Sequence, residues 1–102
     1  MSQVMVRYKV KQDAAALNEE LVRRVYHELH QVKPAGIHYA TFVLEDGVSF
    51  VHLASNESED GRNLLMEIAA FRAFQQGIGE RCDEPPASIG LREIGSYGFW
   101  TD

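Results

Sequence analysis

Residues 39–53 read Tyr39-Ala40-Thr41-Phe42-Val43-Leu44-Glu45-Asp46-Gly47-Val48-Ser49-Phe50-Val51-His52-Leu53. Two runs rich in β-branched and aromatic residues flank an Asp-Gly pair, a strong sequence signal for a β-hairpin. If Asp46-Gly47 is a two-residue type I′ turn, Val43 pairs with Phe50 and Thr41 pairs with His52. One face of the hairpin then carries Tyr39, Thr41, Val43, Phe50 and His52, and the other carries Ala40, Phe42, Leu44, Val51 and Leu53.

The sequence before the hairpin predicts one strand and one helix. Residues 4–10 alternate, with Val4, Val6, Tyr8 and Val10 on one face. Asp13 is then the expected N-cap of a helix that ends before Pro34 and Gly36. Its expected apolar stripe is formed by Leu17, Leu21, Val25, Leu29 and Val32.

The sequence after the hairpin predicts a second helix and a last strand. Asp60 or Asn63 is expected to cap a helix whose apolar stripe is Leu64, Leu65, Ile68, Phe71, Phe74 and Ile78. Residues 80–87, which include Pro85-Pro86, are expected to connect it to a strand over residues 88–100. The order β-α-β-β-α-β predicts an α+β, ferredoxin-like single domain over residues 1–102. We expect a four-stranded antiparallel sheet with two helices on one face.

Composition excludes several classes of function. The chain has 102 residues and a formal net charge of -5, which argues against nucleic acid as a partner because phosphate binding needs basic residues. No apolar run approaches the length of a membrane span, and the first residues lack the apolar segment of a signal peptide. Cys82 is the only cysteine, so no internal disulfide can form, and we expect a cytoplasmic protein.

The hairpin also bears on assembly, because its strands are apolar on both faces and two helices can cover only one face of the sheet. Val43 and Phe50 need cover, and the end of the chain, Tyr97 to Trp100, is rich in aromatic residues. A homodimer with sheet packed against sheet would supply that cover. The alternative is a twisted sheet that leaves some apolar surface exposed.

The chain resembles the dimeric α+β barrel superfamily, and in particular the antibiotic-biosynthesis-monooxygenase-like (ABM-like) proteins. The resemblance lies in residues 5–11, 39–42, 50–53 and 70–74, and residues 80–86 and 95–100 look like those of an uncharacterised bacterial subgroup. It implies a dimeric barrel with pockets between each sheet and its helices. The superfamily includes cofactor-free oxygenases of aromatic polyketides, haem-degrading enzymes and proteins of no known activity.

The chain departs from the active members of that superfamily. These tend to place Trp, His or Asn on helices or at pocket rims, whereas the second predicted helix here has no His or Trp. Asn63 lies at its start, but the only Trp is Trp100. No catalytic assignment is therefore carried over from the resemblance.

The residues themselves offer one candidate site, centred on His52 in the third strand. If Arg7 projects from the same face, His52 is the candidate general base and Arg7 the candidate oxyanion holder. Tyr39, Thr41 and Phe50 are then candidate ligand-binding residues. The alternative is a structural His52, hydrogen-bonded across a dimer interface, with Arg7 in an ion pair between subunits.

Other reactive side chains give weaker signals. His27 and His30 have a spacing that can serve a metal, but no complete ligand set accompanies them, so we expect no metal. Acidic neighbours disfavour a Cys82 thiolate, and one cysteine cannot hold an iron–sulfur cluster.

Two functions are consistent with these patterns. The first is a cofactor-independent monooxygenase acting on a small aromatic or quinol-like substrate, with no cofactor. The second is a non-catalytic dimeric module that binds a small molecule or has a structural role.

Overall fold

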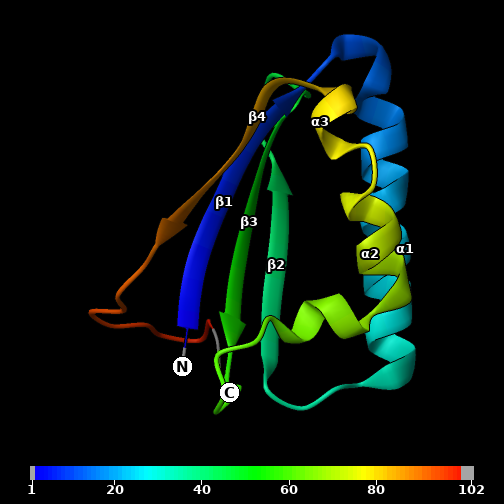
Figure 1. Ribbon diagram of the computed structural model, residues 1–102. Coiled ribbons are helices and arrows are strands. Elements are labelled where there is room, and N and C mark those ends of the chain that lie inside the picture. The colour runs from blue at the N-terminus through cyan, green and yellow to red at the C-terminus, as the bar shows by residue number, and fades with distance from the viewer. Residues whose placement is uncertain (1, 100–102) are drawn as a thin grey trace.

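The computed structural model describes residues 2–99 and contains a four-stranded antiparallel sheet in the order β2-β3-β1-β4 (Figure 1). The strands are β1 (Ser2–Val10), β2 (Ile37–Val43), β3 (Ser49–Asn56) and β4 (Cys82–Gly90). The helices are α1 (Ala15–Val32), α2 (Ala69–Gln75) and α3 (Ile78–Arg81), with short 3-10 segments at Gln12–Ala14 and Leu64–Glu67. The predicted α+β, ferredoxin-like fold is confirmed.

The helices lie together on one side of the sheet, and the other side is left open by them (Figure 1). The covered face includes Tyr8 and Val10 of β1 and Phe50 and Ala54 of β3, all of them buried. They pack with Val25 and other apolar residues of the helices in one core. Phe50 is therefore covered by the chain's own helices, whereas Val43, at the end of β2, is exposed.

The hairpin has the predicted register but a wider turn. Val43 pairs with Phe50 and Thr41 with His52, as the pattern indicated. The chain reverses through a β-turn in which the Gly47 N–H donates to the Leu44 carbonyl, so Glu45 and Val48 lie outside the ladder. The Asp46 carboxylate accepts hydrogen bonds from the Ser49 hydroxyl and from the N–H groups of Val48 and Ser49. These bonds lower the pKa of Asp46 to about 2 and favour the wider loop.

Helix α1 packs through the middle of the predicted stripe, because Val25 is buried and Leu21 and Leu29 pack against the core. Its buried residues are Asn18, Val22 and Val25, whereas the side chains of Leu17 and Val32 are about half exposed. Positions 18, 22 and 25 are spaced by four and three residues and share one helix face. Asp13 does not cap this helix, because the N-cap is Ala14, the last residue of a short 3-10 turn that includes Asp13.

The second helical region is broken into three short pieces. The Asn63 side chain caps the 3-10 segment by accepting from the Leu65 N–H, which decides between the two predicted caps. The Glu28 carboxylate of α1 accepts hydrogen bonds from the N–H groups of Ala69 and Ala70 and so caps α2. Helix α2 ends at Gln75, and Gly77, at a φ of 73°, is the N-cap of α3. Together the 3-10 segment, α2 and α3 form a layer over one face of the sheet, the helical roof (Figure 1).

The last strand lies earlier in the chain than predicted. It covers Cys82–Gly90 and includes Pro85 and Pro86, whereas the sequence predicted a strand over residues 88–100. Arg7 pairs with Ala87 and Lys9 with Glu84, so the two prolines fall at a register shift opposite Tyr8. A proline that donates no hydrogen bond is tolerated on an edge strand or at a bulge. Trp100 lies outside the described residues.

Candidate functional site

A cavity of about 270 Å³ lies between the sheet and the helical roof. Its inner wall is made by side chains of β1, β2 and β3, and its roof by residues of the 3-10 segment and of α2. Its mouth is polar. Its aromatic wall is formed by Tyr8, Tyr39, His52, Phe71 and Phe74, and its polar lining residues include Arg62 and Asn63. Such a space suits a small, planar, largely apolar molecule with polar groups at its ends.

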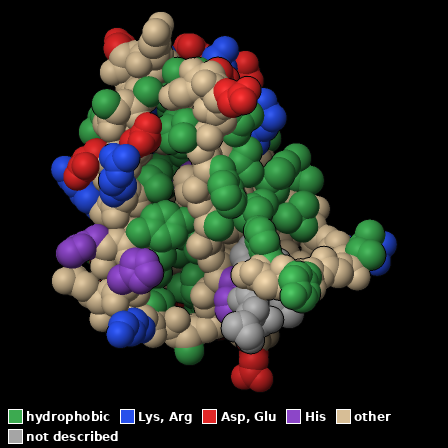
Figure 2. Space-filling model, turned by 180° about the vertical axis from the view of Figure 1, so that it is seen from behind, with side chains coloured by type: hydrophobic (Ala, Val, Ile, Leu, Met, Phe, Trp, Pro, Cys, Tyr) green, Lys and Arg blue, Asp and Glu red, His purple; other side chains and the backbone are tan. Residues whose placement is uncertain are grey.

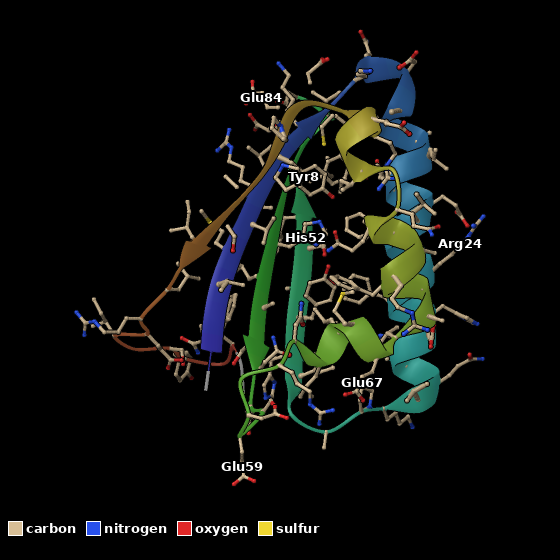
Figure 3. The ribbon with its side chains drawn as sticks, in the orientation of Figure 1. Tyr8, Arg24, His52, Glu59, Glu67 and Glu84 are labelled. Atoms are coloured by element: carbon tan, nitrogen blue, oxygen red, sulfur yellow. The ribbon has the colours of Figure 1, made fainter. Side chains whose placement is uncertain are left out.

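His52 lies at the inner wall and is hydrogen-bonded at both ring nitrogens. Its Nε2 atom lies 2.7 Å from the Tyr8 hydroxyl, and its Nδ1 atom lies 2.5 Å from the Tyr39 hydroxyl and 3.1 Å from Thr41 Oγ1. Figure 3 shows His52 and Tyr8 between the sheet and the helices. The residue is only 4% exposed, and this burial lowers its pKa to about 4. His52 is therefore neutral at pH 7.

The hydrogen-bonded chain continues from His52 into the helices. The Asn18 amide of α1 donates to the Tyr8 hydroxyl over 2.9 Å, and Arg81 Nε of α3 donates to Asn18 Oδ1 over 3.2 Å. The other two nitrogens of Arg81 donate to the carbonyl oxygens of Phe74 and Gln76. A polar chain thus runs Arg81–Asn18–Tyr8–His52–Tyr39 through the buried interior.

A side branch leads from His52 toward the β2 edge. The Tyr26 hydroxyl lies 2.7 Å from Thr41 Oγ1, and the Tyr26 ring stacks on Tyr39 with centroids 5.2 Å apart. Burial raises the pKa of Tyr26 to about 12 and places the pKa values of Tyr8 and Tyr39 further above their ordinary range. All three phenols are neutral hydrogen-bonding groups at pH 7.

The residues predicted to form the site fall into three groups. Tyr39 and His52 line the cavity, and Thr41 reaches it only through its bond to His52. Phe50 is stacked against Tyr8 in the core, 2% exposed, and does not line the cavity. The placement of Arg7 beside His52 was wrong: Val6 pairs with His52 and Arg7 with Val51, so Arg7 projects from the opposite face.

Three members of the polar chain were missed by sequence reasoning. Tyr8 belongs to the apolar face of β1, and that alternation could have revealed that it shares a face with His52. Asn18 shares a helix face with Val22 and Val25, and a polar residue on a buried face is a usable signal. Arg81 gave no signal, because it was assigned to a connector.

The side chains that most often bind metal ions are not clustered in the described part of the chain. Among residues 2–99, no group of three or more His, Cys, Asp and Glu side chains is arranged to hold a metal ion. Over the same residues, no helix combines the length and the apolar character needed to cross a membrane. His27 and His30 of α1 therefore have no further metal ligands beside them within the described residues.

Comparison with known proteins gives a clear result for the fold. No family model matches the chain, and neither does any curated protein. A crystal structure of an antibiotic biosynthesis monooxygenase matches with a TM-score of 0.75 at 16% identity, covering 93% of this chain and all of that one. A Nitrosomonas europaea protein, provisionally assigned to the same group, matches with a TM-score of 0.75 at 15% identity, covering 95% and 93%. A protein of Mycobacterium tuberculosis matches with a TM-score of 0.65 at 18% identity, covering 93% and 96%.

These similarities define the class of structure. The chain has the ABM-like fold over nearly its whole length, which confirms the resemblance in fold. At identities below one fifth, the likeness establishes architecture, and activity has to be argued from the site itself.

Proposed function

We propose that this protein is a cofactor-independent monooxygenase that oxidises a small aromatic or quinol-like molecule in the cavity beneath α2. The observation that supports this proposal best is the neutral His52, held between two tyrosine hydroxyls at the wall of an aromatic cavity. Rings of Phe71 and Phe74 can contact a planar substrate, and Tyr39 can contact its oxygen atom. The ABM-like fold is consistent with this chemistry.

The proposed reaction needs no external reductant. In the oxidation of a phenol to a quinone, one oxygen atom of O₂ becomes the new carbonyl oxygen and the other leaves as water. The substrate supplies all four electrons and loses its hydroxyl proton and one ring hydrogen, which end in the water formed. Loss of the first proton gives an electron-rich anion that can react with O₂, so the protein's task is to stabilise that anion and exclude water. Because both nitrogens of His52 are engaged, His52 acts on the substrate only through Tyr39.

A second function, binding without turnover, is favoured by one observation. Burial lowers the pKa of His52 to about 4, so it is a weak proton acceptor, and neither ring nitrogen has a free lone pair directed at the cavity. A site of this kind can hold a ligand firmly without assisting its chemistry.

Oxygen consumption separates the two functions. We expect the purified protein, without added cofactor, to consume O₂ with a panel of phenols and naphthols and to place one ¹⁸O atom from ¹⁸O₂ in the product. Tyr39→Phe should lower kcat/KM by about 10- to 100-fold, because it removes a hydrogen bond to the reacting oxygen. Tyr97→Phe makes the same chemical change at a fully exposed residue and serves as the control. Ligand binding without O₂ consumption would favour the second function.

We also propose that the protein is a homodimer in which the open faces of two sheets meet. Apolar side chains gather on this side of the molecule (Figure 2). The strand register places Phe42, 48% exposed, and Ile89, 49% exposed, on the face that the helices leave open. A second copy would cover them with a surface of the same chemistry. Because two such faces are self-complementary, one substitution acts twice in each dimer.

Sedimentation tests this assembly. Phe42→Glu places a carboxylate within the proposed contact and should convert the dimer to a monomer. Leu17→Glu, at a half-exposed position of α1 on the helical side, should leave the dimer intact. A wild-type monomer at micromolar concentration would refute the proposal.

A further inference from the structure

We propose that the cavity binds its ligand as an oxyanion held by the Tyr39 hydroxyl, and that Arg81 and Asn18 are the positioning residues that set the direction of this hydrogen bond. The inference rests on the proposed function for the identity of the cavity as the ligand site. It goes further in two respects. It assigns a donor-to-acceptor direction to the hydrogen bonds of the buried polar chain, and it assigns a negative charge to the ligand.

The polarity begins at Arg81, because a guanidinium can only donate hydrogen bonds. Its Nη2 and Nη1 atoms donate to the carbonyl oxygens of Phe74 and Gln76 at 2.7 and 3.0 Å. The remaining donor, Nε, faces the Asn18 side chain at 3.2 Å. Asn18 must therefore turn its amide oxygen toward Arg81 and its NH₂ group toward Tyr8.

The orientation of Asn18 then determines which atom donates and which accepts in each following hydrogen bond of the polar chain. The Tyr8 hydroxyl oxygen accepts from the Asn18 NH₂ group over 2.9 Å, so its own hydrogen is free to donate to His52 Nε2 over 2.7 Å. A neutral imidazole with an accepting Nε2 carries its hydrogen on Nδ1. His52 Nδ1–H therefore donates to the hydroxyl oxygens of Tyr39 and Thr41.

Tyr39 is the last residue of the polar chain, and its hydroxyl is the group that can contact the ligand. Its oxygen accepts from His52, so its own hydrogen is left to donate. Without a ligand, that hydrogen has the Thr41 hydroxyl as an acceptor, and a ligand oxygen in the cavity can take over this role. The inner wall thus offers a donor, which favours a phenolate, enolate or carbonyl oxygen over a hydroxyl group.

The charges around the polar chain also favour an anionic ligand. Among the described residues, no carboxylate pairs with the buried Arg81 guanidinium, which contacts the Phe74 ring that also lines the cavity. Of the titratable groups near the chain, Tyr26 and Cys82 are neutral at pH 7, since burial raises the pKa of each, and the exposed Glu80 carboxylate lies on the Gly77 side of Arg81. At the mouth, Arg62 is already paired with two carboxylates, those of Asp60 and Glu67. The positive charge of Arg81, next to the Phe74 ring that lines the cavity, would therefore favour a bound anion.

The substitution Asn18→Asp keeps the shape of the side chain but should exchange donor and acceptor in each hydrogen bond from Tyr8 to Tyr39. The carboxylate introduced by Asn18→Asp would accept from Arg81 and also from Tyr8, so the Tyr8 hydrogen would leave His52. Tyr8 would then accept from His52 Nε2–H, and the bare Nδ1 would accept from Tyr39. The Tyr39 oxygen would become an acceptor, suited to a neutral phenol. Asn63→Asp adds the same charge at the cavity mouth, outside the chain, and is the matched control.

Two measurements on the intact protein test the inference. Long-range ¹H–¹⁵N NMR reports the tautomer of His52, expected as Nδ1–H in the wild type and in Asn63→Asp, and as Nε2–H in Asn18→Asp. Titration of bound 4-nitrophenol, whose anion is yellow, reports the ionisation of the ligand. We expect the apparent pKa of the bound probe to fall by about one unit in the wild type, a tenfold preference for the anion. In Asn18→Asp this preference should disappear or invert.

The outcomes are distinguishable. An Nε2–H tautomer in the wild type, or a probe that binds as the neutral phenol, would overturn the inference and leave the proposed oxygenase untouched. Anionic binding of the probe without O₂ consumption by any phenol would refute the oxygenase and leave the inference standing. If the probe does not bind in either form, the cavity is not the ligand site and both proposals fail. Arg81→Lys, which keeps the charge but cannot serve three acceptors in a plane, should weaken the preference while keeping the fold.

Discussion

Phe50→Ala should lower the free energy of unfolding by about 3–5 kcal/mol, the usual loss when a buried phenylalanine is truncated. Phe50 is 2% exposed on the covered face of β3, and its ring stacks on Tyr8 with centroids 5.5 Å apart. The closely packed strands and helices around it can collapse only partly into the space left by the ring. Urea denaturation followed by circular dichroism, with a constant m-value, measures the change.

Two further variants serve as controls for this prediction, one that conserves volume and one at an exposed position. Phe50→Leu retains most of the volume and should lose clearly less stability than Phe50→Ala. Leu17→Ala, at a position 52% exposed on α1, should stay within about 0.5 kcal/mol of the wild type. Equal losses at Leu17 and Phe50 would mean that Leu17 is packed into the core and that the exposure of this position is wrong.

Acidification should destabilise the protein by about 3 kcal/mol through His52 alone. The pKa of His52 falls from 6.5 to about 4 on folding, because burial disfavours the imidazolium. Between these two pH values the unfolded chain binds a proton that the folded protein does not, so lowering the pH favours unfolding. The contribution of neutral His52 to the free energy of unfolding is fully present above pH 6.5. It falls as the pH drops toward 4 and changes little below that pH.

The difference between variants isolates this contribution from those of the carboxylates. His52→Gln should be less stable than the wild type at pH 7, but its stability should fall much less between pH 6.5 and 4. His27→Gln, at an exposed position of α1, is the matched control and should keep the dependence seen in the wild type. Parallel curves for His52→Gln and the wild type would show that His52 is not buried in the neutral form.

The sequence predicted the fold well because its strongest signals are local. The pairing of Thr41 with His52 depends only on the centre of one hairpin, and the wider loop around Asp46 preserves that centre. Helix existence and the centre of the α1 stripe followed from apolar periodicity, but the end at Leu17 was wrong, because the polar Asn18 is buried in its place. The last strand was misplaced because Pro85-Pro86 usually excludes a strand, and an edge position with a register shift removes that objection.

The site was predicted only where it lies within the hairpin. Tyr39 and His52 are neighbours across one pair of strands, so their proximity could be predicted. Arg7 was misplaced because the sequence carries no turn that fixes the register of β1 against β3, and a shift of one residue exchanges the faces. Arg81 and Asn18 are 63 residues apart and meet only through tertiary packing, which no local pattern encodes.

The polar chain draws one residue from each of five elements: Tyr8 from β1, Asn18 from α1, Tyr39 from β2, His52 from β3 and Arg81 from α3. The hairpin alone can bring Tyr39 to His52, but the complete chain cannot close until β1 has paired with β3 and both α1 and α3 have docked. The chain is therefore a late event in folding, and buried bonds of this kind stabilise the finished structure more than the transition state that precedes it. Changes at these residues should mainly accelerate unfolding and leave the rate of folding nearly unchanged, so the site would govern how long the native state lasts.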